Sequence, residues 1–495
     1  MGIVAKQSGW NLVSGYMGTL LGALNTLLLF PATFPENPEM MGSIRWVLST
    51  SLVISAFVHW GWPQAMVTWL PKLDQMIQRR VFNFGRSLIS WTLLLLLLLT
   101  YWKGPELVTY VTNDSLSGDW SPWIWVLVAT YAYFELHAAI LIHNQRVVLP
   151  YVLKDSGRKL TITVLLLGTM LGWLTFDQMV AGLLVIYAAM TVLVTWGAYR
   201  MMPARATERT TWSKRPIVNY ALTMLLTTSA VMMFGQLDIM MVGAWLGMDA
   251  VSQYAIVLNF GLVVAMPMKA MNASLRPLIA KLVASESWAE LETMCLRAVA
   301  SQWFAASGIF LLVLMVAPWL LAWLPPAYQG GAGALIWLAS AQLIHVTTGP
   351  SGLVIVSSSI YRWGLYANVI MLIMALGLGW YWIPIGGVVG AAQVFFVAVV
   401  SLNLFKVMAI MKLTGSAWID WRLLGSMLWT AIAASALIAL LPSTFERTAL
   451  LSMDTALLLL VSAAVVLIWF MAGLFIMNLA PDLKSQLHKI INWLT

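Results

Sequence analysis

Three polar side chains recur at helical spacing inside the otherwise apolar stretch 250–280. Lys269 lies near its middle, and Asn272 and Arg276 follow at i+3 and i+7, which places all three on one face of a helix. A charge at bilayer depth costs about 2.5–3.5 kcal/mol, so it usually faces a partner or a water-filled cavity. Lys and Arg supply the charge-assisted donors that bind a diphosphate. The alternative is that Arg276 only marks the cytoplasmic end of the helix and that Lys269 extends toward the interface.

A second cationic group lies on the apolar stretch 43–70. Arg45 opens this stretch, and His59 lies close to the same stripe. An internal repeat, described below, makes this stretch equivalent to 250–280, which carries Lys269. We therefore expect Arg45 and His59 to face the same water-filled cleft as Lys269. The alternative for Arg45 is a lipid-headgroup contact at the outer surface. The alternative for His59, which has a Trp on either side, is a hydrogen-bonded residue at the membrane interface.

Three titratable residues in apolar stretches are candidates for ion coupling. Glu135 and His137 lie within 120–142, and Asp238 lies near the end of 216–245. A membrane-embedded carboxylate can carry a proton or bind Na⁺, and His titrates near physiological pH. The alternatives are that Glu135 is a structural partner for a basic residue on a neighbouring helix and that Asp238 lies at the outer surface.

Other chemistry finds little support in the sequence. His345 stands alone before Gly349-Pro350, a setting more typical of a structural residue, and the single Cys295 excludes a disulfide scaffold and a Cys-based metal cluster. The sequence has no P-loop, no GxGxxG after a strand and no HExxH. We therefore expect no enzyme activity, no catalytic residues, no cofactor and no metal.

The elements that position these residues follow from composition. Of 495 residues, 61% are hydrophobic and 9% are charged, whereas soluble domains are closer to half apolar and a quarter charged. This excludes a soluble fold, a disordered chain and a nucleic-acid-binding module. A membrane-spanning helix needs about 20 mostly apolar residues. The sequence therefore predicts an all-α polytopic membrane protein with about 14 spans, near 9–30, 43–70, 87–102, 120–142, 159–176, 178–199, 216–245, 250–280, 298–324, 332–358, 363–382, 385–411, 422–441 and 453–478.

Charges in the connections test this count. Basic residues concentrate in the even-numbered connections, with Arg146, Lys154, Arg158 and Lys159 in the fourth and Lys406, Lys412 and Arg422 in the twelfth, while acidic residues dominate the odd-numbered ones. Lys and Arg favour the cytoplasmic side. We therefore expect a multi-pass membrane protein with both termini in the cytoplasm, and the family resemblance described below implies the bacterial inner membrane.

A weak internal repeat divides the chain. The long second helix of each half begins after an acidic residue, and the two helices are offset by about 206 to 210 residues. The predicted organisation is an N-terminal six-helix lobe at 1–200, a basic cytoplasmic linker at 201–215, a C-terminal six-helix lobe at 216–413, and two additional helices with a cytoplasmic tail at 414–495. Parallel repeats of this kind occur in transporters, although two hydropathy patterns can also coincide by chance.

Several motifs in the second half resemble those of bacterial polysaccharide exporters. The run Gln236-Leu237-Asp238-Ile239-Met240-Met241-Val242-Gly243-Ala244-Trp245-Leu246-Gly247, followed by Asp249-Ala250-Val251-Ser252-Gln253-Tyr254, is similar to their signature between helices 7 and 8. Tyr328 with its small neighbours is similar to the turn before helix 10, and Ile383-Pro384-Ile385-Gly386-Gly387 to the start of helix 12. The family is that of the lipid-linked oligosaccharide flippases (Wzx-like O-antigen and exopolysaccharide exporters), within the superfamily of multidrug, oligosaccharidyl-lipid and polysaccharide exporters.

This resemblance implies two six-helix bundles in a V around a central cleft, with alternating access. The substrate would be a polyprenyl-diphosphate-linked oligosaccharide that moves from the cytoplasmic to the outer leaflet, for O-antigen or exopolysaccharide export. Expected partners are this substrate, membrane lipids, H⁺ or Na⁺ and the polysaccharide polymerase or export machinery, without nucleic acid. The alternatives are a cation-coupled multidrug extruder of the same fold and a non-transporting component of a polysaccharide synthesis complex. A membrane-embedded glycosyltransferase or ligase would need a paired acidic motif, which is missing.

Overall fold

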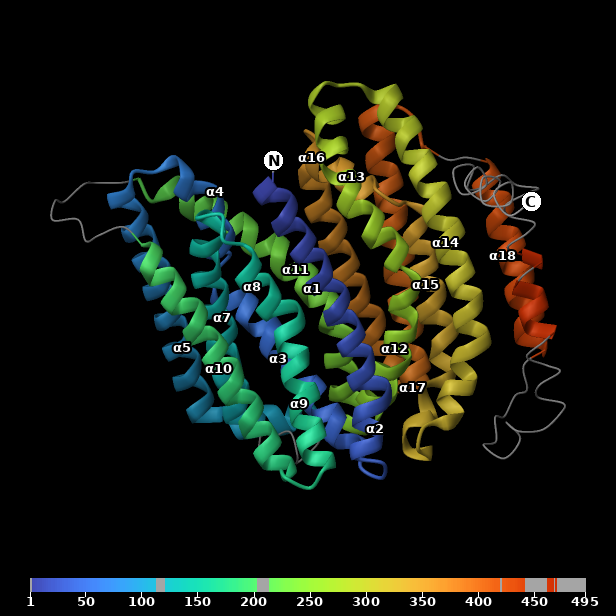
Figure 1. The fold of residues 1–495 in the computed structure, drawn as a ribbon, viewed down its shortest axis with the longest axis horizontal. Helices are drawn as coiled ribbons and strands as arrows, with labels where there is room; N and C mark the ends of the chain where they lie inside the picture. The colour runs from blue at the N-terminus through green and yellow to red at the C-terminus, as the bar shows by residue number, and fades with distance from the viewer. Residues whose placement is uncertain are drawn as a thin grey trace. The chain divides into compact units, whose positions relative to one another are not determined.

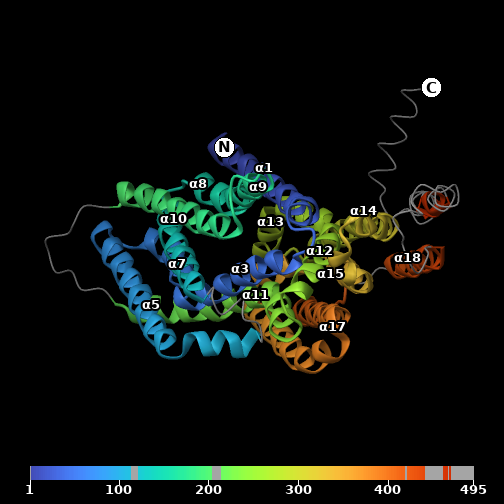
Figure 2. The ribbon, with the colours of Figure 1, turned by 90° about the horizontal axis from the view of Figure 1, so that it is seen from below.

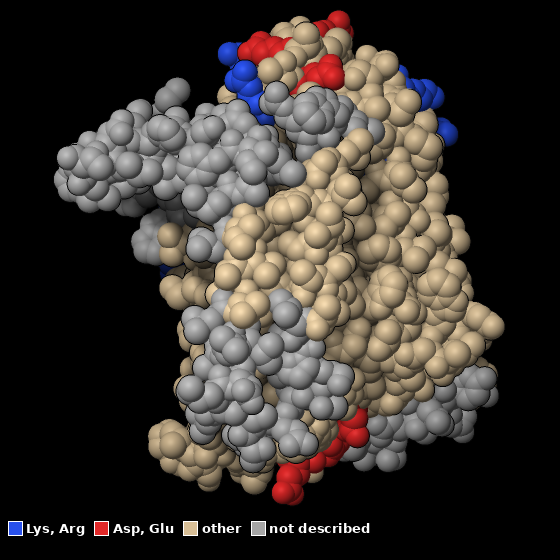
Figure 3. Space-filling view, turned by 90° about the vertical axis from the view of Figure 1, so that its right-hand side faces the viewer, with Lys and Arg blue, Asp and Glu red and all other residues tan. Residues whose placement is uncertain are grey.

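The computed structural model describes residues 2–112, 121–202, 213–418, 421–440, 461–466 and 468–469. Regular secondary structure within these residues is helical throughout. Seven helices are long and apolar enough to cross a membrane, or eight if the bent pair Met248–Val264 and Met266–Ala284 counts as one span. On the face shown in Figure 3, the described charged side chains gather mainly at the two ends and leave an uncharged band between them, as contact with lipid tails requires. The chain is therefore an all-α multi-pass membrane protein, as predicted.

The chain divides into two compact units, Met1–Ala255 (unit 1) and Ile256–Thr495 (unit 2). Unit 1 contains α1 (Gly2–Leu24), the π-helix η1 (Asn25–Leu29), α2 (Phe30–Thr33), α3 (Pro38–Val58), α4 (Trp62–Trp69), the 3-10 helix η2 (Leu70–Lys72), α5 (Gln75–Thr112), α7 (Ser121–His143), α8 (Val148–Val152), the π-helix η3 (Leu153–Gly157), α9 (Arg158–Met170), α10 (Phe176–Met201) and α11 (Arg215–Leu246). The helix α12 (Met248–Val264) begins in unit 1 and ends in unit 2.

Unit 2 continues with α13 (Met266–Ala284), α14 (Trp288–Trp323), the 3-10 helix η4 (Pro326–Ala334), α15 (Leu335–Thr347), α16 (Ser351–Ser357), α17 (Tyr361–Thr414) and α18 (Trp421–Leu440). The first thirteen predicted spans coincide with helices or helix pairs of the two units, and most of the fourteenth, 453–478, lies outside the described residues.

The two helices that carry most candidate residues of unit 1 lie in its interior. Figure 2 shows α3 and α7 between a row formed by α10, α9, α8 and α1 and a second row formed by α5 and α11. The contacts agree, because α7 packs against α3, α4, α5 and α10, while α1 packs against η3 and α9. Polar residues on α3 and α7 therefore face other helices of the unit.

In unit 2, α15 packs against α14 and α17, and α13 packs against α14 and α16 (Figure 1). Buried apolar side chains hold these helices together near the turn between α13 and α14; they include Ile279, Leu291, Val354 and Ile410. The only cysteine, Cys295, is a buried free thiol in this cluster. Its thiol therefore contributes to the apolar packing of this cluster.

Long helices of this chain break at Pro and Gly, which interrupt the helical hydrogen-bond ladder. Gly61, in the left-handed region at φ 65°, precedes Pro63 at the start of α4. The chain bends by 50° between α12 and α13, where Pro267 opens α13, and Gly387 at φ 59° kinks α17. The first two breaks follow the ends of α3 and α12, at Val58 and Val264, which are 206 residues apart. This spacing falls within the offset of the predicted internal repeat.

Glycine allows α11 and the start of α12 to approach α3 closely. A Cβ on Gly42 would overlap the Met248 carbonyl oxygen, and one on Gly243 would overlap the Trp46 ring. Trp46 also donates a 3.3 Å hydrogen bond from Nε1 to the Met240 carbonyl. Ser49 donates one of 2.7 Å to Gln236 Oε1. Small residues of this kind are what membrane helices use to bring their backbones together.

We expect the change Gly42→Ala to destabilise the protein by about 1–3 kcal/mol, because the added methyl group meets backbone that cannot move aside. Gly235→Ala is the matched control, since it lies in α11 with open space around its Cα and should be neutral or stabilising by about 0.5–1 kcal/mol. Apparent melting temperatures of the purified variants in detergent test the difference. Equal melting temperatures would show that the close contact at Gly42 is unimportant.

Candidate functional site

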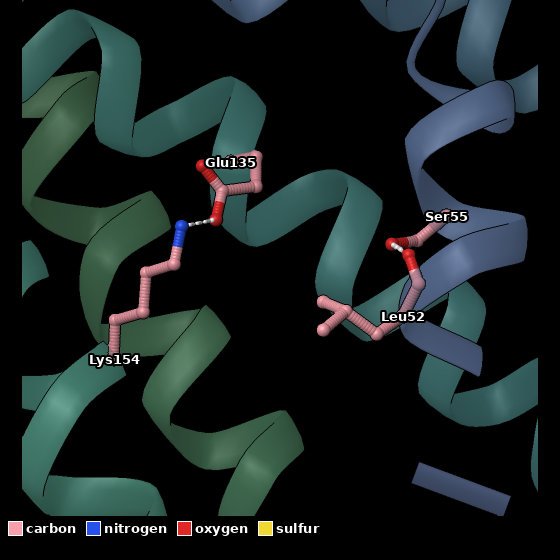
Figure 4. Close-up of polar contacts among 4 residues, drawn as sticks. All are labelled: Leu52, Ser55, Glu135 and Lys154. Carbon is pink, nitrogen blue, oxygen red and sulfur yellow. Dashed lines mark hydrogen bonds and ion pairs between the residues drawn. The ribbon is translucent and has the colours of Figure 1, made fainter. Parts of the chain in front are cut away.

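The carboxylate of Glu135 forms an ion pair in the interior of unit 1. Lys154 Nζ lies 2.6 Å from Glu135 Oε1, joining α7 to the π-helix η3 (Figure 4). The Glu135 side chain keeps 25% of its surface exposed and the Lys154 side chain 32%, so the pair borders open space. Of the two predicted roles of Glu135, this contact fits that of a partner for a basic residue.

Arg158 lies next to this pair, at the start of α9, and packs against aromatic rings. Its guanidinium carbon is 4.4 Å from the ring centre of Tyr131, 4.9 Å from that of Phe134 and 5.8 Å from that of Tyr187. The Tyr187 hydroxyl donates a 3.3 Å hydrogen bond to the Arg158 carbonyl. Aromatic faces attract a planar cation without neutralising it. The guanidinium is therefore held in place with its positive charge intact.

Arg45 completes the basic residues of this region. Its guanidinium contacts the hydroxyl of the buried Thr26 in η1. Asn25, next to Thr26, donates to the Lys159 carbonyl over 2.9 Å and accepts from the Thr163 hydroxyl over 2.8 Å. The contact holds Arg45 by a neutral hydroxyl, so its charge is also retained. Both π-helices of unit 1 thus lie beside basic side chains, and such local widenings of a helix are frequent at functional sites.

Electrostatic interactions connect these residues into one group. Lys154, Arg158 and His59 act on the Glu135 carboxylate, and Arg158 and Arg45 both act on the Tyr187 hydroxyl. His59 is buried at the end of α3, where its Nδ1 accepts a 3.2 Å hydrogen bond from the Gly61 N–H. We call Arg45, His59, Glu135, Lys154 and Arg158 the unit 1 cluster. With one carboxylate and three permanent cations, the cluster has a net charge of +2 when His59 is neutral. This charge suits the binding of an anion with two negative charges.

Two predicted coupling residues lie apart from this cluster. His137 points toward α5 and α10, with Nδ1 2.7 Å from the Tyr133 carbonyl and ring contacts to Phe82 and Tyr199. Asp238 is buried near the end of α11 and accepts hydrogen bonds from the Tyr254 hydroxyl over 2.9 Å and from the Ile239 N–H over 2.8 Å. His137 thus has aromatic surroundings, whereas Asp238 keeps a carboxylate with two neutral donors.

The remaining predicted residues lie on α13 in unit 2. Lys269 and Arg276 are exposed. Asn272 is partly buried, with Oδ1 accepting a 3.0 Å hydrogen bond from Gln302 and Nδ2 donating one of 3.5 Å to the Gly349 carbonyl. The structure therefore uses Asn272 to connect helices and leaves the two cations available.

Sequence reasoning missed Lys154, Arg158 and Lys406 as site residues because it counted them among the cytoplasmic connections. The structure places Lys154 and Arg158 in the packed segment η3–α9 and places Lys406 within α17. A signal for Arg158 was present, since Tyr131 and Phe134 are three residues apart on one helix face and offer a paired aromatic surface. No group of three or more possible metal ligands occurs within the described residues.

No protein-family model matches this chain, and no curated protein matches it. Among solved structures, it is similar to the lipid II flippase MurJ in an inward closed conformation, with a TM-score of 0.70 over 93% of this chain and 98% of that one, at 11% identity. The chain shares the fold of that flippase. The similarity to a mutant of the Vibrio cholerae MATE transporter VcmN is weaker, with a TM-score of 0.49 and 14% identity over 85% of this chain and 100% of that one. An inward-facing multidrug resistance MATE family transporter of the MOP superfamily gives a TM-score of 0.48 and 13% identity over 87% of this chain and 99% of that one.

We expect Glu135→Gln and Lys154→Met to destabilise the protein by about 1–3 kcal/mol each, because each leaves one charge without its partner. The partial exposure of the pair keeps the effect below that of a fully buried one. The double variant should cost less than the sum of the two. Apparent unfolding free energies of the four proteins test this coupling, and strictly additive losses would mean that the ion pair contributes nothing to stability.

Proposed function

We propose that this protein is a membrane transporter that flips a polyprenyl-diphosphate-linked oligosaccharide from the cytoplasmic to the outer leaflet of the bacterial inner membrane. The unit 1 cluster carries this proposal, because Arg45 and Arg158 keep their charges inside a membrane protein without an ion pair within the described residues. A diphosphate that bridges a lipid and a sugar carries two negative charges, which two arginines balance. The similarity in fold to a lipid II flippase supports a lipid-linked substrate.

The transport cycle in this proposal is alternating access. The two six-helix lobes predicted at 1–200 and 216–413 would rock about a cleft, with the additional helices at 414–495 outside the repeat and both termini in the cytoplasm. The diphosphate would bind to the unit 1 cluster, while the polyprenyl chain stays in lipid. Lys269 and Arg276 of unit 2 stay proposed as further substrate-binding residues. O-antigen or exopolysaccharide precursors remain the proposed cargo, and polymerase or export machinery the proposed partner.

Energy would come from the membrane potential or from an ion gradient. One unit charge moving across 100 mV is worth about 2.3 kcal/mol, and an inside-negative potential favours outward movement of an anion. Coupling to H⁺ or Na⁺ would use Asp238 in preference to Glu135, because Glu135 already holds Lys154 whereas the partners of Asp238 are neutral donors.

Removing one arginine of the unit 1 cluster should slow flipping strongly. We expect Arg45→Gln and Arg158→Gln to lower the rate roughly 10- to 100-fold, since a hydrogen bond to a charged group contributes about 1.5–3 kcal/mol. The assay uses purified protein in liposomes loaded with a polyprenyl-diphosphate oligosaccharide, whose outer-leaflet exposure is detected by an added enzyme. Arg362→Gln is the control, because Arg362 lies at the exposed start of α17 beside the ring of Tyr361.

Three outcomes separate the alternatives. Flipping that persists in both arginine variants would leave the function but remove this site. Absent flipping combined with proton-driven uptake of an organic cation would identify a multidrug extruder. Absent transport of either substrate by folded wild-type protein would favour a non-transporting component of a synthesis complex.

Asp238→Asn tests ion coupling separately, because it keeps the shape of the side chain and removes its negative charge. We expect flipping in the variant to lose its response to an imposed H⁺ or Na⁺ gradient while its response to voltage persists. Flipping rates are compared with each gradient present and then collapsed by an ionophore. A variant that responds to the gradients as wild type does would exclude Asp238 as the coupling residue.

A further inference from the structure

Unit 2 holds a polar network at the break between α15 and α16. Thr348, at the end of α15, donates a 2.6 Å hydrogen bond to Asn403 Oδ1 on α17. The next residue, Gly349, accepts from Asn272 on α13, which in turn accepts from Gln302 on α14. Four helices thus meet at one point through neutral amide and hydroxyl groups, where Gln302 Oε1 stays buried without a hydrogen-bond partner among the described residues.

Three basic residues lie one helical turn from members of this network. Lys269 precedes Asn272 by three residues, His345 precedes Thr348 by three, and Lys406 follows Asn403 by three. Both lysines act electrostatically on His345, Lys406 more strongly. The α16 backbone also approaches Lys406, since a Cβ on Gly352 would lie 3.9 Å from its Cε. Side chains from α13, α15 and α17 therefore converge beside the break.

The helices that carry these three basic residues contain no carboxylate. Residues 293–419, which contain α15, α16, α17 and nearly all of α14, include neither Asp nor Glu, and α13 has none either. The acidic residues in the connection and first turns before that stretch are Glu286, Glu290 and Glu292, of which Glu292 accepts a hydrogen bond from Ser416. His345 also has a buried Nδ1 without a hydrogen-bond partner within the described residues.

Lys269 lies far from both ends of its helix pair. It is 21 residues after the start at Met248 and 15 residues before the end at Ala284. At 1.5 Å per residue, the nearer end is about 22 Å along the helix. Where such a helix crosses a membrane, a charge near its middle faces water or a partner.

We infer that Lys269, His345 and Lys406 form a second anion-binding site, contained within unit 2, that takes a phosphate group. Two ammonium groups and a ring nitrogen supply charge-assisted donors, and the adjoining amide and hydroxyl groups keep the helices in register around them. The phosphate can belong to the lipid-linked substrate or to a phospholipid headgroup, and either source would provide the counter-ion that the sequence omits. This site does not depend on the proposed function, because binding is measured without flipping.

The test is protection of the lysines from an amine-reactive reagent, measured by mass spectrometry on the purified full-length protein. Saturating inorganic pyrophosphate should slow labelling of Lys269 and Lys406 by roughly tenfold and leave Lys412 unchanged. Lys412 is the internal control, because it lies on the same helix near its exposed end, 4.8 Å from the ring centre of Trp363. Unchanged labelling of Lys269 and Lys406 would overturn the site.

Variants give the second measurement. Lys406→Gln should weaken the protection of Lys269 about tenfold in pyrophosphate concentration, which corresponds to 1.4 kcal/mol, whereas Lys406→Arg and the control Lys412→Gln should preserve it. Protection of Lys269 that survives Lys406→Gln unchanged would overturn the shared site. Each variant is first shown to be monodisperse with a wild-type melting temperature.

Two further ligands identify the source of the phosphate. Protection by a short isoprenyl diphosphate at lower concentration than by pyrophosphate assigns the site to the lipid-linked substrate. Protection by phosphatidylglycerol nanodiscs, and not by uncharged ones, assigns it to a phospholipid headgroup. Loss of flipping without loss of protection would separate a failure of the proposed function from a failure of this site.

Discussion

Positive charge inside a membrane protein is costly unless something negative or highly polar accompanies it, and this chain contains more such cations than carboxylates. In unit 1, one carboxylate, Glu135, serves Lys154, while Arg158 depends on aromatic faces and Arg45 on a hydroxyl. None of these neutral contacts removes the charge. The surrounding helices are arranged to tolerate unneutralised cations, which is useful only if an external anion arrives to bind them.

The arrangement of the helices follows from this requirement and from close backbone packing. Interior helices α3 and α7 carry the polar residues, and glycine contacts fix α11 against α3. Breaks at His59–Gly61 and at Ala265 place non-helical backbone between consecutive helices, and His59, Gly61 and Ala265 are buried. Non-helical backbone at membrane depth is tolerated where it is buried in protein or borders a water-filled cavity. The helix breaks and the cations therefore have the same requirement, which is that protein or water and not lipid surrounds them.

Much of the fold could be predicted from the sequence, because apolar length and the alternation of basic connections report directly on membrane spans. The hydrogen bond between Asp238 and Tyr254 also explains why these two residues occur together in the motif around Gly247, which ends α11. The site was harder to predict. In the sequence, Lys154 and Arg158 look like ordinary cytoplasmic charges, and only the packing of η3 and α9 shows that they lie beside Glu135 and Tyr131. Lys406 was counted in a connection, whereas the structure places it within α17, one turn from Asn403. Side-chain contacts between helices that are far apart in the sequence leave no periodic pattern from which they could be predicted.

The acid-free stretch 293–419 has a consequence for any pH–rate profile of this protein. Its lysines and arginines keep their charge at moderately acidic pH, so α15, α16 and α17 present the same electrostatic surface there, apart from His345. The two candidate coupling carboxylates, Glu135 and Asp238, both lie in unit 1. A carboxylate-dependent acidic limb in such a profile would therefore arise outside residues 293–419.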